Sequence, residues 1–315
     1  MIPYLLRRVA QSVAVVLVVT IIVFILLHQL PGGPARAVLG DRATPLQVAQ
    51  FNQQNGLNRP LVVQYFDYLH RWATGDFGFS YKLNQSVGSL LAQRLPKTLV
   101  LNALALLFTL VVAIPVGVIQ AVRRNRLVDY LGTTLSFIFY AAPTFFLGLI
   151  LIQVFSGKLG LLPPEAPQSD GVRPIFADFT AMVLPIVTLA LLSIAGFSRY
   201  MRSSVLDNIS ADYVRTARSK GCSPVRVLRA HVLRNALIPI ATLVGLSLPV
   251  LFAGALVTES IFNFPGMGLL FWQSAQTSDF PVELGVVLVT AVATVVGNLL
   301  ADLSYVLLDP RVRFG

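Results

Sequence analysis

The sequence has few of the residues that carry cysteine or metal chemistry. A single cysteine, Cys222, occurs among 315 residues, which excludes an internal disulfide. The three histidines, His28, His70 and His231, are too widely separated to suggest a metal site. No G-x-x-x-x-G-K-S/T phosphate-binding loop is present, so we expect neither nucleotide hydrolysis by that route nor a cofactor in this chain.

Charge is scarce as well. Asp, Glu, Lys and Arg make up 12% of the chain, whereas 55% is hydrophobic and the mean hydropathy is +0.73. This balance indicates a protein that crosses a membrane several times, in contact with membrane lipid. The net charge of +10 comes from cations at the ends of apolar runs. Membrane topology explains such cations, so we expect no nucleic-acid partner.

Six apolar runs are long enough to cross the roughly 30 Å hydrocarbon core as helices at about 1.5 Å per residue. Unpaired backbone groups cannot face lipid and no alternating barrel pattern occurs, so the predicted class is all-α. We therefore predict a polytopic membrane protein with six transmembrane helices. The predicted spans are residues 9–27, 98–122, 131–157, 179–198, 235–258 and 284–308.

The first run resembles a secretory signal, because Arg7 and Arg8 precede it and the small residues "ARA" follow it. Its charge-free stretch of 19 residues exceeds the apolar region of a signal, so we expect a retained anchor. If the N-terminus is cytoplasmic, 15 of the 24 Lys and Arg residues lie on that side, and the outer loop at 263–281 has none. Both termini are therefore predicted to be cytoplasmic.

These boundaries divide the chain into four parts. Residues 1–30 form the N-terminal end and first span, and 31–97 form an extracytoplasmic helical segment. Residues 98–308 form a core of five spans with a cytoplasmic loop at 199–234, and 309–315 form the cytoplasmic C-terminus.

The extracytoplasmic segment contains two predicted helices. Thr44 and Gln47 form a capping box at the start of the first, and Gly56 ends it. The second runs over 60–74 before Gly75. Its apolar stripe either packs as a cap over the bundle or serves as a docking surface. The stripe consists of Leu61, Tyr65, Tyr68, Leu69 and Trp72.

Four prolines lie inside predicted spans, where each removes a backbone hydrogen bond. They are Pro115, Pro143, Pro185 and Pro249. Kinks or breaks are expected there, either as ordinary membrane-helix prolines or as hinges that line a pathway.

The polar stretch 211–239 is unusual in so apolar a chain. Its first part favours a helix over 209–220, and Gly221 is placed to end that helix in the left-handed conformation. Ser223 then offers a hydroxyl cap and Pro224 a first helical position, with Val225, Leu228 and Val232 on one face. The segment is either a positive-inside loop that sets topology or a protein-docking element.

Several motifs resemble one family in the same order along nearly the whole chain. The loop motifs are "YVRTARSKG" and "RNALIP", and the others are "GDFGFS", "RLPKTLVLNALAL", "LPIVTLAL", "ESIFNFPGMG" and "DPRVR". They are similar to the permeases of binding-protein-dependent ABC importers, in the dipeptide, oligopeptide and nickel group. The resemblance implies the type I importer permease fold, with six spans and a bacterial inner-membrane location. It also implies a second permease, two ATPase subunits and an extracytoplasmic binding protein.

The family's cytoplasmic loop pattern, Glu-Ala-Ala, three residues and Gly, falls here on Arg215, Thr216, Ala217 and Gly221; only Ala217 and Gly221 keep the residue type. The resemblance implies that this loop couples the permease to the ATPase, with Tyr213, Val214 and Ala217 in the partner's groove. The predicted coupling residues are Tyr213, Val214, Arg215, Thr216, Ala217, Arg218 and Gly221. The "PGGP" at 31–34 departs from the family's Pro-Gly-Asp-Pro at Gly33.

Two acidic residues lie at or inside span ends, where charge is costly. Glu259 is either a solvated helix end or part of a gate at the turn that contains Pro265 and Gly266. Asp302 either pairs with an arginine at the cytoplasmic edge or contacts substrate.

Peptides are the predicted cargo, with nickel or another small solute as the alternative in the same class. An ion-coupled secondary transporter would need acids or histidines within the membrane and usually an internal repeat, whereas here mid-membrane charge is nearly absent and we find no convincing repeat. "GFS" at 196–198 resembles a serine-hydrolase motif, but no histidine follows in a later span.

Overall fold

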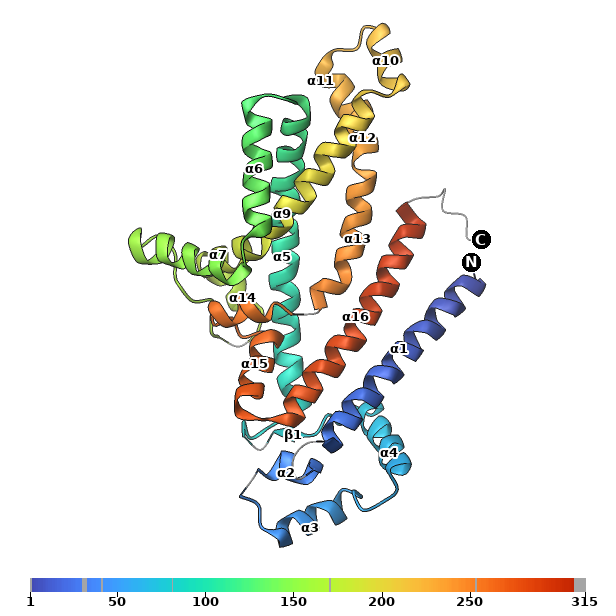
Figure 1. The fold of residues 1–315 in the computed structure, drawn as a ribbon, viewed down its shortest axis with the longest axis vertical. Coiled ribbons are helices and arrows are strands. Elements are labelled where there is room, and N and C mark those ends of the chain that lie inside the picture. Colours follow the sequence, from blue (N-terminus) through green and yellow to red (C-terminus); the bar gives the residue numbers. More distant parts are fainter. Residues whose placement is uncertain are drawn as a thin grey trace.

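The computed structural model describes residues 2–29, 33–40, 42–80, 82–169, 171–252 and 254–308, with the backbone alone at 2–6, 27, 37 and 302–308. These residues form an elongated helical bundle (Figure 1). The N-terminal part contains α1 (Ile2–Gln29), α2 (Gly33–Leu39), α3 (Pro45–Gln54) and α4 (Leu61–Ala73). They are followed by β1 (Phe79–Ser80), which pairs antiparallel with β2 (Gln85–Ser86).

The remaining elements form the core and the loops between its spans. They are α5 (Val87–Val122), α6 (Leu127–Ala141), α7 (Thr144–Leu151), η1 (Ile152–Lys158), α8 (Arg173–Ala177), α9 (Thr180–Ile209), α10 (Asp212–Ser219), α11 (Pro224–Arg226), η2 (Val227–Val232), α12 (Leu233–Ala236), α13 (Ile238–Phe252), α14 (Leu256–Ile261), α15 (Met267–Thr277) and α16 (Phe280–Leu308).

The helices confirm the multi-span architecture. Five are long and apolar enough to cross a membrane, and a sixth span results if the bent pair 127–158 counts as one. The predicted span 131–157 is not one continuous helix, because its two halves meet at an angle of 108°. Ala142, the residue before Pro143, is extended with ψ 133°. The proline ring disfavours the helical conformation in the residue that precedes it, which explains the break.

The other three prolines do not break their helices. Pro115, Pro185 and Pro249 lie inside α5, α9 and α13. A break is therefore confirmed at Pro143, and kinks at the other three prolines stay a prediction. The predicted end of the span 235–258 is wrong, because the apolar helix ends at Phe252 and Thr258 belongs to the short, separate helix α14.

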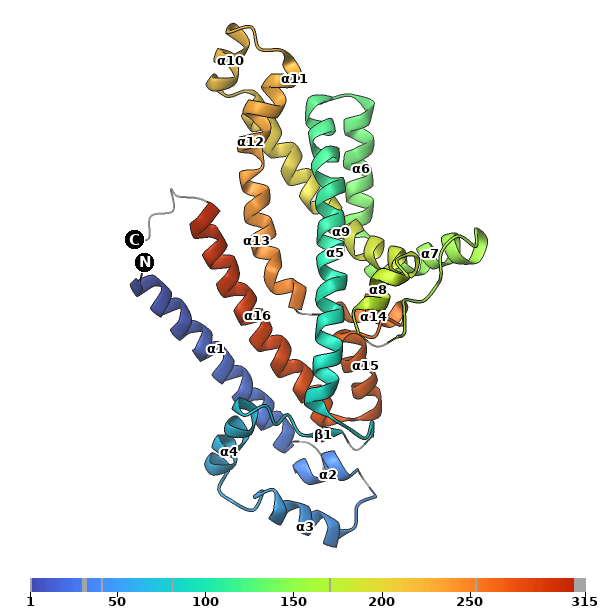
Figure 2. The same ribbon diagram turned by 180° about the vertical axis from the view of Figure 1, so that it is seen from behind.

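The two polar parts of the chain lie at opposite ends of the bundle. α10 and α11 project from one end, whereas α2, α3 and α4 surround the other end (Figure 2). This arrangement agrees with the predicted cytoplasmic and extracytoplasmic sides. α5 runs along most of the length beside α9, and α1 lies beside α16 at the edge.

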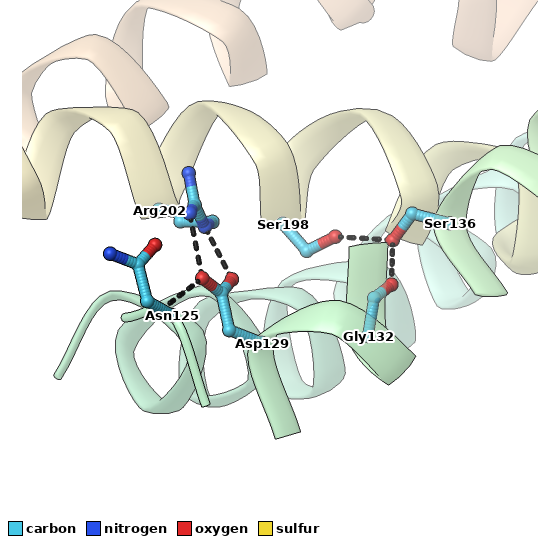
Figure 3. Close-up of polar contacts among 6 residues, drawn as sticks. All are labelled: Asn125, Asp129, Gly132, Ser136, Ser198 and Arg202. Carbon is cyan, nitrogen blue, oxygen red and sulfur yellow. Dashed lines mark hydrogen bonds and ion pairs between the residues drawn. The ribbon is translucent and has the colours of Figure 1, made fainter. Parts of the chain in front are cut away.

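Close backbone contact explains the pairing of α5 with α9. A Cβ added at Gly117 would lie 2.6 Å from the carbonyl oxygen of Ser198, so glycine is required at this crossing. Polar contacts join α6 to α9 beside it (Figure 3). There the Ser198 hydroxyl lies 3.5 Å from that of Ser136, so the "GFS" serine packs between helices.

The segment between α1 and α5 confirms the predicted caps. The Thr44 and Gln47 capping box is formed, and Gly56 adopts φ +68° directly after the end of α3. Tyr65 of α4 hydrogen-bonds to Thr20 of α1 at 2.9 Å, and its ring contacts Phe24. The aromatic part of the stripe therefore packs on the bundle, whereas Leu61 at its start remains 59% exposed.

Candidate functional site

Helix α10 is terminated as the sequence predicts. Its first residue, Asp212, places a negative charge at the positive end of the helix dipole. Gly221 adopts φ +79°, and its N–H donates to the Arg218 carbonyl at 2.9 Å. The N–H of Cys222 donates back to the Ala217 carbonyl at 3.2 Å. Only glycine takes this left-handed conformation without strain, so the residue is required for the turn.

The inner face of α10 packs against the core of this chain. Val214 is 0% exposed and Ala217 is 6% exposed. Both belong to a buried cluster that includes Met201 and Val205 of α9 and Val232 of η2. The prediction that Val214 and Ala217 reach into a partner's groove is therefore wrong, because their side chains already anchor α10 to the spans.

The outer face of α10 is polar and basic. Tyr213, Arg215, Thr216 and Arg218 are exposed, together with Lys220 at its end. The contact of Arg215 with Asp212 is long, at 3.5 Å, and both side chains are largely in solvent. Such surface pairs contribute little to stability, so these side chains are available for a partner.

The segment after Gly221 differs from its predicted form. Ser223 occupies the cap position but its hydroxyl makes no capping bond. Of the predicted face, Val232 is buried and Leu228 packs against the same cluster, but Val225 is 60% exposed and Val227 is buried instead. The helix widens into a π-helix over Val227–Val232, where hydrogen bonds run from i to i+5, so the spacing of an α-helix does not give the buried face.

Glu259 of α14 is 0% exposed, so it is not a solvated helix end. Its Oε1 accepts a hydrogen bond from the Thr98 hydroxyl at 2.9 Å and from the Ala255 N–H at 3.3 Å. Its Oε2 accepts from the Leu269 N–H at 3.0 Å. Burial raises the pKa of the Glu259 carboxyl, and these hydrogen bonds act against that rise.

The glycines of the "NFPGMG" turn allow the backbone to approach this carboxyl group. A Cβ at Gly266 would lie 2.5 Å from both Glu259 Oε2 and Thr98 Oγ1, and one at Gly268 would lie 2.6 Å from the Leu256 backbone. Thr98 also accepts from the Met267 N–H at 2.8 Å. The carboxyl group therefore holds the start of α15 against α5.

Sequence reasoning named Glu259, Pro265 and Gly266, which lie together in this turn and are all buried. It missed Thr98, which stands where the apolar run of α5 begins. A hydroxyl at that position looks like an ordinary span residue in the sequence, and only the packing of α5 on the turn shows its role.

The loop over residues 159–169 covers the same turn. The Ala166 N–H donates to the Phe262 carbonyl at 2.8 Å, and the Gln168 side chain donates to the Asn263 carbonyl at 2.6 Å. Lys97, beside Thr98, donates to the Ser169 carbonyl at 2.9 Å. The turn is thus enclosed by α5, α14, α15 and the 159–169 loop, and we call this assembly the outer turn.

One predicted contact falls outside the described parts of the chain. Asp302 belongs to the last turns of α16, but its side chain is outside the described residues. The two arginines nearest the C-terminus, Arg311 and Arg313, lie outside them as well. The pairing of Asp302 therefore stays a prediction.

Comparison with known proteins gives matches along the entire chain. Residues 113–314 match the family described as binding-protein-dependent transport system inner membrane component, and residues 1–102 match its N-terminal family. The chain is 40% identical to the oligopeptide transport system permease protein AppB of Bacillus subtilis over 313 residues, 99% of each chain.

Two further relatives agree with this match. The probable peptide ABC transporter permease protein y4tP of Sinorhizobium fredii is 38% identical over 99% of each chain. The glutathione transport system permease protein GsiC of Salmonella typhimurium is 36% identical over 100% of each chain. The chain therefore belongs to the inner membrane components of binding-protein-dependent transport systems, as a multi-pass permease subunit of an ABC importer.

Proposed function

We propose that this permease forms half of a pathway that carries di- and oligopeptides into the cell. The support comes from relatives that match from end to end and whose names specify oligopeptide, peptide or glutathione transport. A permease for nickel or another small solute is the alternative within the same class. Membership of the family excludes the ion-coupled transporter considered above.

Permease subunits of this family hydrolyse no ATP and carry no cofactor, and they work with ATPase and binding-protein partners. We propose that the partners here are one second permease, two ATPase subunits and one extracytoplasmic binding protein. The exposed basic face of α10 is the proposed contact with the ATPase. Arginine suits this contact because it stays charged and can bind a carboxylate with two hydrogen bonds.

The packing of α10 supports a mechanical role. Val214 and Ala217 share one buried cluster with Met201 of α9, Val232 of η2 and Ile240 of α13. Close-packed interiors transmit displacement rather than absorb it. Movement of α10 with a closing ATPase dimer would therefore tilt α9 and α13 together, which opens or closes the pathway.

The outer turn is the proposed barrier on the opposite side. It is attached to α5 through Thr98 and Glu259, and α5 packs along α9. A tilt of α9 would thus reach the turn through α5. In this proposal Glu259 positions the gate and has no role in chemistry.

The test is reconstitution of the complete complex in proteoliposomes with its binding protein. We expect peptide-loaded binding protein to stimulate both ATP hydrolysis and peptide uptake. Stimulation by a nickel-loaded binding protein, without any by peptides, would favour the alternative. Gly221→Pro should assemble but fail to transport, since proline cannot adopt φ +79°. Normal uptake by that variant would refute the coupling role of α10.

A further inference from the structure

Arg199 of α9 places its guanidinium group against two aromatic rings of α6. Its Cζ lies 4.8 Å from the centroid of the Tyr140 ring and 5.4 Å from that of Phe137. Both distances are within the range of cation–π interactions. Its neighbour one turn further along α9, Arg202, forms an ion pair with Asp129. The two arginines therefore serve different purposes.

The Arg199 guanidinium group lies within the membrane-spanning part of the bundle. Arg123, Arg124 and Arg126 mark the cytoplasmic edge just before α6 begins. Tyr140 stands thirteen residues after the first residue of α6, Leu127, which is about 20 Å along the helix. That depth is more than half of a hydrocarbon core of roughly 30 Å.

The charge of Arg199 lacks a counterion within the described part of this chain. The ion pairs formed there involve other arginines, and the Arg199 Nε atom is buried without a hydrogen-bond partner. Phe137 and Tyr140 are each 55% exposed, so the site is open on the side of the rings. An unpaired charge at this depth is too costly to face lipid and marks a pathway or a ligand.

We propose that Arg199 receives the C-terminal carboxylate of a peptide in transit, with Phe137 and Tyr140 forming the wall beside it. This inference rests on the proposed peptide function. The rings hold the guanidinium plane in place, and a carboxylate would supply both the missing charge and two acceptors. A peptide always carries this carboxylate whatever its side chains, so the contact suits a permease that accepts varied sequences.

The first experiment measures uptake of a tripeptide by the reconstituted complex with its binding protein. Arg199→Gln should lower uptake by about tenfold or more, because a charge-assisted contact to the substrate is lost. Arg199→Lys should retain an intermediate rate. Tyr200→Phe is the matched control on the same helix, since Tyr200 is exposed and outside this cluster, and it should leave uptake unchanged.

The second experiment detects the substrate directly. The photoreactive residue p-benzoylphenylalanine replaces Phe137, and the complex is illuminated during transport of a radiolabelled tripeptide. We expect a labelled adduct of the permease, with a much lower yield when Arg199→Gln is also present. Equal assembly of both variants, measured by co-purification, ensures that the difference reports on the site.

The outcomes separate the inference from the proposed function. If the wild-type complex carries no peptide, the proposed function fails and this inference fails with it. If it carries peptide but the adduct forms only with lipid or with the second permease, the carboxylate site alone is refuted. Unchanged uptake by Arg199→Gln would refute it in the same way.

Discussion

Asp129 and Arg202 form a bidentate ion pair that joins the start of α6 to α9 (Figure 3). The Arg202 Nε donates to Asp129 Oδ1 at 2.7 Å and Nη2 donates to Oδ2 at 2.8 Å. The Asn125 N–H adds a third bond to the carboxylate at 3.0 Å. The Asp129 side chain is only 4% exposed, so this pair contributes to the relative placement of the two helices.

Replacing Asp129 with Asn should destabilise the permease. The change leaves Arg202 without its counterion in a largely buried position, and we expect a loss of about 2 to 3 kcal/mol in the free energy of unfolding. Thermal unfolding in detergent measures the effect. Asp207→Asn is the matched control, since Asp207 is exposed on the same helix α9. Equal stability of the two variants would contradict the structural role of the pair.

The glycines of the outer turn should tolerate no side chain. At Gly268 a methyl group would meet the Leu256 backbone at 2.6 Å, and backbone cannot move aside cheaply. We expect Gly268→Ala to lower stability by about 1 to 3 kcal/mol, as overpacking does. Gly196→Ala in α9 is the control, because nothing lies within 4 Å of its added Cβ. If both variants unfold at the same temperature, the close approach at Gly268 is not present in solution.

Glu259→Gln keeps the shape of the side chain and replaces one acceptor oxygen with a donor. At least one of the N–H and O–H groups that now point at the carboxyl loses its bond, which should cost about 1 to 3 kcal/mol. Glu165→Gln, which changes an exposed residue of the loop over the turn, provides the comparison in thermal unfolding. A Glu259→Gln permease as stable as the Glu165→Gln permease would show that the carboxyl does not organise the outer turn.

The two faces of α10 should respond differently to charge. Val214→Asp buries an unpaired carboxylate in the cluster with Met201, so we expect loss of folded permease. Arg215→Glu alters only the exposed face, so the fold should survive while affinity for the ATPase falls roughly tenfold, about 1.4 kcal/mol. Membrane yield and co-purification of the ATPase measure the two effects. Normal ATPase binding by Arg215→Glu would place the contact elsewhere.

Local physical rules account for much of the fold. Long apolar runs can cross a bilayer only as helices, so the sequence determined the class, most of the spans and the separation of the two polar ends. The capping box at Thr44 and the left-handed Gly221 were predictable because each depends on a few neighbouring residues. The family was recognisable for the same reason, since its motifs are short and keep their order.

The tertiary structure decided what depends on residues far apart in the chain. Helical spacing could not show that Val214 points into the bundle, because a surface helix and a packed one share that pattern. Nor could helical spacing predict the hydrogen bond between Thr98 and Glu259. It also could not show that the Arg199 guanidinium group lies over the Tyr140 ring rather than at the cytoplasmic edge. Each of these contacts depends on how whole helices cross and where α6 bends. Those crossings are set by side-chain packing across the bundle, which no local stretch of sequence specifies.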